Sequence, residues 1–316
     1  MANIQDTSHP VRILMYHAVI QSPLRIPDWC FLDVSDFRTQ MKYIKSNFEV
    51  IPLSEAVAKL EAKAVRRPTA VITFDDGFQN NYDVAFPILR EEGLPATIFL
   101  TTGLVGTNDT FWFCRLNRAL TNTTRSSLKW NGCAFDLSGV EAKTRASAII
   151  QARLKDFPHP QLLAELRKII ISLDDDPDCP IDIDSPFRVL GRAQITKMST
   201  TGMIEIGAHT RSHAILSLLP VRQREEEIGQ SVETVQELTN QPCDLFAYPN
   251  GRREDYDLDS IGILQTFGVY TAVTAIEGLN DSGTPLMELR RYGIGSDLTM
   301  NEFEAMMNEG QLADSH

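Results

Sequence analysis

VITFDDGFQNN, residues 71–81, is a hydrophobic run that ends in two adjacent carboxylates, Asp75 and Asp76, followed by Gly77. The run has the composition of a buried strand, so the carboxylates stand where that strand would end. Adjacent like charges repel, and burying even one carboxylate is costly without a counter-charge. A solvated turn closed by Gly77 would account for the pair equally well. The rest of the chain must therefore supply the counter-charges if the pair is to form a buried site.

The bulk composition is that of a globular protein with a large core. The chain has 316 residues, of which 43% are hydrophobic and 23% charged, which suits one large domain or two small ones. Its formal net charge of -12 argues against nucleic acid as the main partner, because such binding depends on Lys and Arg neutralising phosphates. The same charge gives no support for docking to an anionic membrane surface.

The cysteines and the N-terminal sequence bear on location. Five scattered cysteines without C-x-x-C spacing argue against a disulfide framework and against a thiolate zinc site. The N-terminal sequence lacks the pattern of a signal peptide, and no apolar stretch is long enough to span a bilayer. We therefore expect a cytoplasmic protein without a transmembrane segment; the sequence predicts no particular oligomeric state.

Short apolar runs alternate with amphipathic helical patterns along most of the chain. Continuous apolar runs of this length are typical of parallel strands buried on both faces. The helical pattern that follows residue 34 begins with Ser35 as the expected N-cap, and Thr299 with Glu302 forms a capping box. About seven β–α units predict a barrel-like α/β fold, in which the chemistry lies at the C-terminal ends of the strands. The candidate strands are residues 12–19, 70–74, 96–101, 203–208, 244–249, 269–275 and 289–294.

Residues 106–192 interrupt this alternation. They contain a hairpin-like stretch, LKWNGCAFDL from residue 128, and several helical patterns. We interpret them as a mostly helical insertion that packs beside or over the mouth of a barrel formed by residues 1–105 and 193–316. The aspartates between 174 and 184 lack the ligand spacing of an EF-hand loop, so a solvated loop is the simpler interpretation.

Two histidines could join the paired carboxylates in binding a positively charged metal ion. His209 and His213 in the stretch EIGAHTRSHAIL are spaced i, i+4, which on a helix or helix-like turn puts both imidazoles on one side. Two histidines and one carboxylate form a common open site for a divalent metal ion. An isolated H-x-x-x-H is a weak signal, but its combination with TFDDG predicts a metal site.

A third polar segment follows another predicted strand. The stretch FAYPNG, residues 246–251, contains Tyr248, Pro249 and Asn250 just past the strand. Exposed backbone N–H groups in such a turn could face an oxyanion that develops during a reaction, although the same sequence by itself is an ordinary turn. These three residues are the candidates for contact with the substrate and its oxyanion.

TFDDG, HTRSH and FAYPNG, in this order, resemble the NodB-like polysaccharide deacetylases of carbohydrate esterase family 4. The stretches ILMYHAV and NYDVAFPILREEGLPATIFL resemble the branch that contains poly-N-acetylglucosamine deacetylases. The resemblance covers about residues 11–105 and 195–307. It implies an α/β fold, specifically a distorted (β/α)7 barrel, and one divalent metal ion, usually zinc and sometimes cobalt or nickel. It also implies hydrolysis of an N-acetyl group on an amino sugar.

The resemblance assigns roles to individual residues. Asp76, His209 and His213 match the metal ligands of the family, and Asp75 matches its catalytic base. The adjacent carboxylates then have a physical explanation, because the metal ion neutralises Asp76 while Asp75 stays free to accept a proton from the attacking water. Asp75 needs a cation to hold it in place, and we expect this to be Arg291.

Arg290 is the alternative to Arg291 as the cation beside Asp75.

The chain departs from the family pattern at two points. Many members have an arginine two residues before the proline of the third motif, where this chain has Ala247. The C-terminal L-x-H segment that usually supplies the catalytic acid is missing, and His316 is the only nearby histidine. We expect His17 to replace it, because the first and last strands of a barrel can be neighbours. The alternative is a ring that only forms hydrogen bonds at the barrel mouth or orients water.

The leading hypothesis is a metal-dependent deacetylase that acts on an amino sugar, a glycan or a glycoconjugate. A small-molecule amidase or deformylase could use the same metal site. A sugar-binding module with a decayed site is the non-enzymatic alternative. The sequence leaves the sugar, its chain length and its linkage open.

Overall fold

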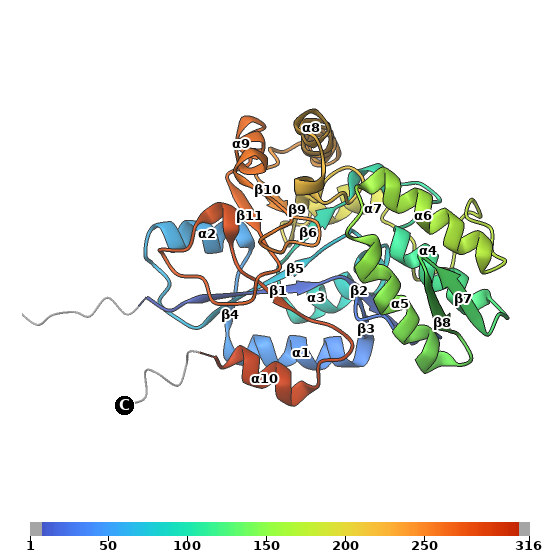
Figure 1. Cartoon of the computed structure of the whole chain (residues 1–316). Coiled ribbons are helices and arrows are strands. Elements are labelled where there is room, and N and C mark those ends of the chain that lie inside the picture. Colours follow the sequence, from blue (N-terminus) through green and yellow to red (C-terminus); the bar gives the residue numbers. More distant parts are fainter. Residues whose placement is uncertain (1–7, 310–316) are drawn as a thin grey trace, which may run out of the picture.

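The computed structural model describes residues 8–309, and an all-parallel sheet forms its centre (Figure 1). The strands follow one another in the order β11-β10-β9-β6-β5-β1-β12, and β4 pairs with the beginning of β5. Every strand pair in this sheet is parallel, as the continuous apolar runs predict. The strands are β1 (Val11–Tyr16), β4 (Glu49–Val50), β5 (Thr69–Phe74), β6 (Ala96–Leu100), β9 (Ile204–Ala208), β10 (Leu245–Ala247), β11 (Thr271–Val273) and β12 (Tyr292–Gly293).

The two ends of the sheet approach each other through one segment of chain. Leu289 forms a parallel bridge with Val273 at the end of β11, and three residues later Tyr292 pairs with Leu14 of β1. The sheet is therefore curled towards closure. The prediction of a distorted (β/α)7 barrel is confirmed, with short strands at its closing edge.

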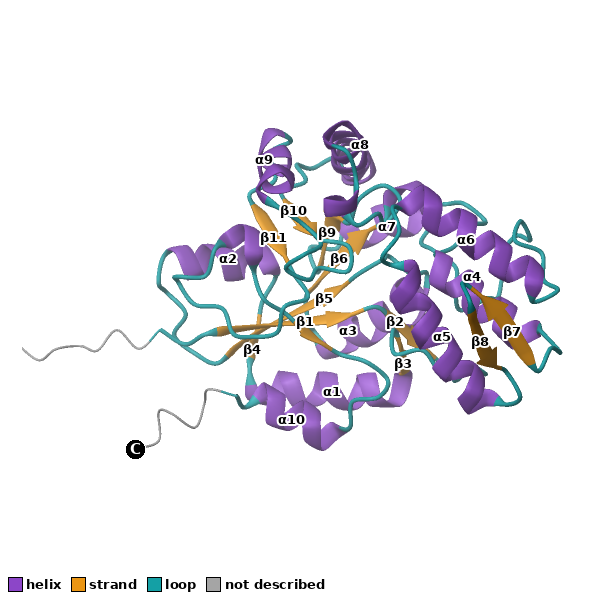
Figure 2. Cartoon of the chain, in the orientation of Figure 1, coloured by secondary structure: helices purple, strands orange, loops and turns teal. Residues whose placement is uncertain are grey.

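Helices cover the outside of the curled sheet (Figure 2). The predicted capping box of Thr299 and Glu302 begins α10, whereas the prediction for Ser35 is wrong. The N-cap of α1 is Asp33, whose carboxylate accepts the backbone N–H of Ser35 at 2.8 Å. The helices around the sheet are α1 (Val34–Asn47), α2 (Leu53–Glu61), α3 (Phe86–Glu92), α7 (Arg192–Ser199), α8 (Val221–Thr239), α9 (Leu258–Thr266) and α10 (Met300–Met307).

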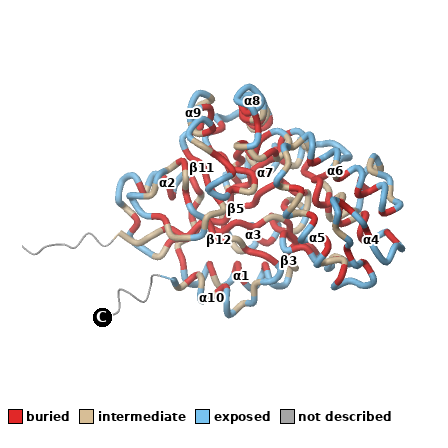
Figure 3. Tube along the Cα trace, in the orientation of Figure 1, coloured by how far each residue is buried: buried red, intermediate tan, exposed pale blue. Residues whose placement is uncertain are grey.

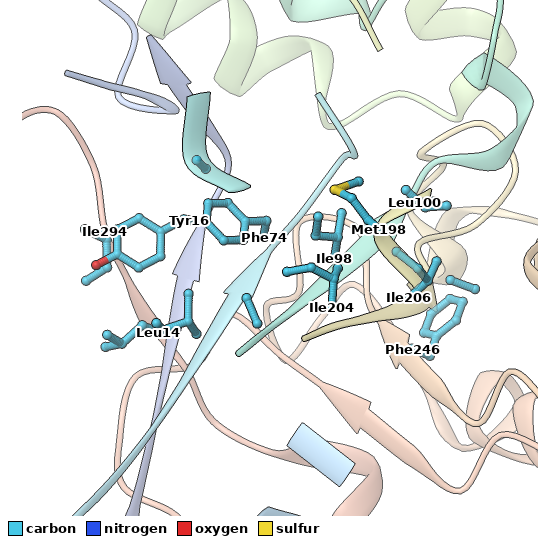
Figure 4. Close-up of a cluster of buried hydrophobic side chains, with 14 of the residues drawn as sticks. Leu14, Tyr16, Phe74, Ile98, Leu100, Met198, Ile204, Ile206, Phe246 and Ile294 are labelled. Carbon is cyan, nitrogen blue, oxygen red and sulfur yellow. The ribbon is translucent and has the colours of Figure 1, made fainter. Parts of the chain in front are cut away.

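The main hydrophobic core lies between these helices and the strands. Figure 3 shows that the sheet and the facing sides of the helices are buried, and Figure 4 shows the side chains that β1, β5, β6 and β9 contribute. Phe74, Ile98 and Phe246 are each at most 1% exposed. A core of this kind holds the strand ends in fixed positions, because tightly packed interiors resist displacement.

Residues 106–192 form a second group of elements beside the sheet (Figure 1). The predicted hairpin is present, with Asn131 and Gly132 at positive φ as a two-residue turn requires. Apolar side chains of this segment form a separate hydrophobic cluster with Ile20, Phe31 and Phe78. The elements are α4 (Trp112–Asn122), β7 (Ser127–Trp130), β8 (Cys133–Asp136), α5 (Val140–Leu154) and α6 (His159–Ser172), and the short strands β2 (Ala18–Ile20) and β3 (Phe31–Asp33) pair nearby. The division of the chain at residues 106 and 192 stays a prediction.

Across residues 8–309, no helix combines the length and apolar character needed to cross a bilayer. His316, the C-terminal histidine of the sequence, lies outside the described residues.

Candidate active site

The turn after β5 is held in an unusual backbone conformation. Asp76 has a φ of 75° and Gly77 a φ of 76°, and the former is uncommon for a residue with a side chain. At Gly77 an added Cβ would lie 2.7 Å from a Leu100 methyl carbon, so that side chain would have to shift, while the positive φ itself favours glycine. Asp75 still continues the ladder, since its N–H donates to the Tyr16 carbonyl at 2.9 Å. Left-handed residues of this kind persist where the surroundings hold them, often at functional sites.

Asp75 forms an ion pair with Arg291, the cation expected from the sequence. The guanidinium donates to both carboxylate oxygens of Asp75, at 2.7 and 2.8 Å, and to the Thr274 carbonyl at 2.7 Å. Both charged side chains are buried, whereas Arg290 is exposed. Burial is the largest single influence and by itself would raise the pKa of Asp75. The charge and hydrogen bonds of Arg291, together with the smaller effects of His209 and His17, outweigh burial and hold this pKa well below its usual range. Asp75 therefore stays ionised.

Asp76, His209 and His213 form a compact set of ligand atoms. One potential ligand atom from each lies within 4.8 Å of the others, and the His209 and His213 Nε2 atoms are 3.8 and 3.4 Å from Asp76 Oδ1. Within the described part of the chain, neither carboxylate oxygen of the buried Asp76 has a hydrogen-bond partner. Burial, together with the Asp75 charge, raises the pKa of Asp76 well above its ordinary value. A buried carboxylate with free oxygens beside two imidazoles fits a divalent metal ion.

The two histidines meet through a loop and not through a helix. Thr210 and His213 both have positive φ, at 59° and 61°, so the expected helix-like turn is wrong even though the rings come together. The loop is tied to α8, because Glu227 accepts the N–H and the hydroxyl of Ser212 at 2.8 and 2.7 Å. These hydrogen bonds, in place of a helical backbone, hold the loop that carries both rings.

The orientation of the His209 ring follows from its backbone partner. Its Nδ1 lies 2.7 Å from the carbonyl oxygen of Ala247, and since a carbonyl can only accept, Nδ1 carries the proton. The lone pair of Nε2 is then directed to the side where Asp76 lies. A partner of this type fixes the tautomer of many metal-binding histidines.

A cavity of about 350 Å³ brings the predicted residues together. Asp75, Asp76, His209 and His213 line it, and so does His17. His17 packs edge-on against Trp29, and among the described residues its Nδ1 has no hydrogen-bond partner. Burial lowers the pKa of His17 to about 4, although the Asp75 charge opposes this. The ring is therefore neutral at neutral pH.

The YPNG turn offers fewer hydrogen-bond donors than the sequence analysis expected. The Tyr248 N–H donates to the Val273 carbonyl at 3.1 Å, and its hydroxyl donates to the Met287 carbonyl. Pro249 has no N–H. Asn250, which lines the cavity, is the one of the three whose backbone N–H has no partner in the described chain. Asn250 is therefore the remaining candidate for contact with an oxyanion.

Lys155 is the cavity residue that sequence reasoning missed. It follows α5 directly, and its Nζ donates to Asn250 Oδ1 at 2.7 Å. Trp112 and Phe113 of α4 line the same cavity. No motif marks Lys155, since it is separated from the YPNG turn by 95 residues. Its position depends on the tertiary structure, which brings the end of α5 to the turn after β10.

Solved structures with a similar fold span nearly the whole chain. The deacetylase PplD of Streptococcus pyogenes, determined with acetate, superposes with a TM-score of 0.63 at 18% identity and covers 95% of this chain and 99% of its own. IcaB from Ammonifex degensii gives a TM-score of 0.61 at 19% identity and covers 94% of this chain and 97% of its own. At these identities the likeness shows a shared fold.

Sequence comparisons add shorter but closer matches. YxkH of Bacillus subtilis, described as a polysaccharide deacetylase, is 34% identical over 97 residues, or 30% of this chain. A poly-beta-1,6-N-acetyl-D-glucosamine N-deacetylase of Staphylococcus epidermidis is 32% identical over 75 residues, or 23% of this chain. The matches span 33% and 26% of those proteins' own lengths. A family model described as polysaccharide deacetylase matches residues 62–272, well over half of the chain. By this match, and in agreement with its curled parallel sheet, the chain belongs to the polysaccharide deacetylase family.

Proposed function

We propose that this protein is a metal-dependent hydrolase that removes the N-acetyl group from an amino sugar within a glycan or glycoconjugate. The observation that carries the proposal is that two carboxylates in one cavity have different surroundings. Asp75 is held ionised by Arg291, while Asp76 points free oxygens at two imidazoles. One carboxylate is thus suited to proton transfer and the other to metal binding.

Asp76, His209 and His213 would hold the ion, which we propose to be Zn²⁺, with Co²⁺ or Ni²⁺ as alternatives. A bound divalent ion supplies Lewis acidity towards the acetyl oxygen and the attacking water. Two nitrogen ligands and one oxygen ligand suit zinc and leave coordination positions for other groups.

The protein's own groups have separate tasks in this proposal. Asp75 accepts a proton from the water that attacks the acetyl carbon, and Arg291 keeps its carboxylate ionised and oriented. The backbone N–H of Asn250 donates to the acetyl oxygen as negative charge develops there. The proposal that His17 is the acid stays a prediction, and its low pKa weakens it because a neutral imidazole is a poor proton donor.

The substrate class rests on the family and on one relative. The relative from Staphylococcus epidermidis is named for action on poly-beta-1,6-N-acetyl-D-glucosamine, which makes an N-acetylglucosamine polymer the first substrate to test. The cytoplasmic location stays a prediction.

The experiment measures the free amine, together with acetate or formate, that the purified protein releases before and after metal removal. The protein is stripped with a chelator, reloaded with Zn²⁺, Co²⁺ or Ni²⁺, and incubated with N-acetylglucosamine oligomers or with their N-formyl counterparts. Metal-dependent release of acetate supports the proposal. Preference for the N-formyl compounds would favour a deformylase, and binding without hydrolysis would favour a sugar-binding module.

A further inference from the structure

Lys155 occupies the boundary between two adjoining cavities. One is the 350 Å³ cavity that holds Asp75 and Asp76, and the other, of about 700 Å³, lies between α5 and the segment that follows β10. Lys155 and Arg252 line both. Positions 144, 148 and 151 share one face of α5, as i, i+3 and i, i+4 spacing dictates, and they line the larger cavity together with Lys155, the residue that follows this helix. The segment 106–192 thus contributes a cation to the active site.

The hydrogen bonding of Lys155 leaves part of its ammonium available. Asn250 Oδ1 is its hydrogen-bond acceptor among the described residues, and Asn250 is itself held by Asp255, whose Oδ2 accepts its side-chain N–H at 2.6 Å. An ammonium has three donor protons, so two remain for a ligand. The acceptor is therefore fixed in place while the ammonium faces the cavities.

The charges around Lys155 suit a proton donor. Burial lowers the pKa of Lys155 below its ordinary value; the nearby Arg252 also lowers it, while Asp28 and Asp255 oppose the change. Cys30 likewise opposes it. An ammonium with a lowered pKa releases its proton more readily than an exposed lysine, and catalysis is most efficient when this pKa approaches the working pH.

Lys155 also lies where the leaving group, the amine of the sugar, would be placed. The acetyl group is small and has to reach Asp75 and Asp76, whereas the sugar that carries the nitrogen needs the space of the larger cavity. Lys155 lies between these two regions. His17 lines only the inner of the two cavities.

We infer that Lys155 is the catalytic acid, which gives its proton to the sugar nitrogen as the bond between that nitrogen and the acetyl carbon breaks. The inference rests on the proposed function. Water adds to the acetyl carbon while Asp75 takes one of its protons. The C–N bonding pair then leaves with nitrogen, which receives a proton from Lys155 Nζ. Acetate and the free amine result, and solvent returns Asp75 and Lys155 to their starting states.

The test compares two leaving groups in the metal-loaded full chain. An N-acetylglucosamine oligomer needs its amine protonated, whereas 4-nitrophenyl acetate releases a phenolate that needs no proton. The variants are Lys155→Met, Lys155→Arg and His17→Gln, with Lys129→Met as a control at an exposed lysine in the same segment. Arginine keeps the charge but holds its proton too tightly to act as an acid. Bound metal and melting temperature are measured for every protein.

We expect Lys155→Met and Lys155→Arg each to lower kcat on the oligomer by about 10²–10⁴-fold, the usual contribution of an acid or base. Their KM, bound metal and rate on 4-nitrophenyl acetate should stay close to those of the unsubstituted protein. Lys129→Met should behave like the unsubstituted protein on both substrates. A role in binding alone would instead raise KM.

Three results would overturn the inference while leaving the proposed function intact. One is recovery of the oligomer rate by Lys155→Arg, which would mean that only the charge matters. Another is an equal loss on both substrates, and the third is a selective loss in His17→Gln with none in Lys155→Met. An unsubstituted protein that cleaves the ester but no N-acetyl sugar overturns the proposed function and the inference together.

Discussion

Replacing Arg291 by methionine is expected to lower the free energy of unfolding by about 3–5 kcal/mol, because it leaves a buried carboxylate without its counter-charge. The hydrogen bonds to Asp75 are 2.7 and 2.8 Å long, and Arg291 and Asp75 are 0% and 3% exposed. Little solvent therefore reaches Asp75 to compensate for the lost charge. The Thr274 carbonyl also loses its guanidinium donor, which adds about 1 kcal/mol.

Urea unfolding of the metal-free protein, followed by circular dichroism, measures the effect. The matched controls are Asp75→Asn and the double variant Asp75→Asn with Arg291→Met. We expect the double variant to be more stable than Arg291→Met, because no unpaired charge is then buried. Equal or lower stability of the double variant would refute the idea that the buried charge causes the loss.

The pH dependence provides a second check with a defined sign. In the unsubstituted protein the Asp75 pKa is lowered, so its contribution to stability is present above the unfolded pKa near 4 and is lost as the pH falls below it. Without Arg291, burial raises this pKa above its unfolded value, and protonation then relieves the penalty. The destabilisation by Arg291→Met should therefore shrink as the pH falls towards the unfolded pKa near 4. A difference independent of pH would contradict this reasoning.

The remaining predictions concern the metal site. Asp76→Asn, His209→Ala and His213→Ala should each reduce bound metal and activity together, and full metal occupancy measured by elemental analysis would remove that residue from the ligand set. Asp75→Asn should keep its metal but lose about 10²–10⁴ in kcat, since a base acts in the chemical step, and loss of metal would mean that the two carboxylates have exchanged roles. A chelator should abolish activity while circular dichroism stays unchanged, because the core is built from strands and helices; loss of secondary structure would indicate a structural ion.

Much of the site could be predicted because its chemistry is local in sequence. Asp75 and Asp76 follow directly from a strand that is buried along its whole length. In a parallel sheet the ends of such strands meet at one edge, so His209, after β9, comes close to them. A cation was expected beside Asp75 because a buried carboxylate needs a counter-charge, and Arg291 was the candidate with Arg290 as the alternative.

The predictions that failed depend on backbone conformation and on solvent exclusion. The i, i+4 spacing of His209 and His213 indicated a helical turn, whereas the loop brings the rings together through left-handed residues fixed by Glu227. The Tyr248 N–H was a candidate oxyanion donor, but in the structure it donates to the Val273 carbonyl of the neighbouring strand. These outcomes are set by neighbours that no local pattern contains.

The sequence by itself determined the curled parallel sheet and the paired carboxylates at its edge, because strand burial and charge compensation leave their pattern in adjacent residues. Only the tertiary structure decided what surrounds them. It brought Lys155 from the end of α5 to Asn250, and it buried His17 deeply enough to lower its pKa to about 4. The physical reason is that packing between distant segments sets both the desolvation of a side chain and the partners within its reach.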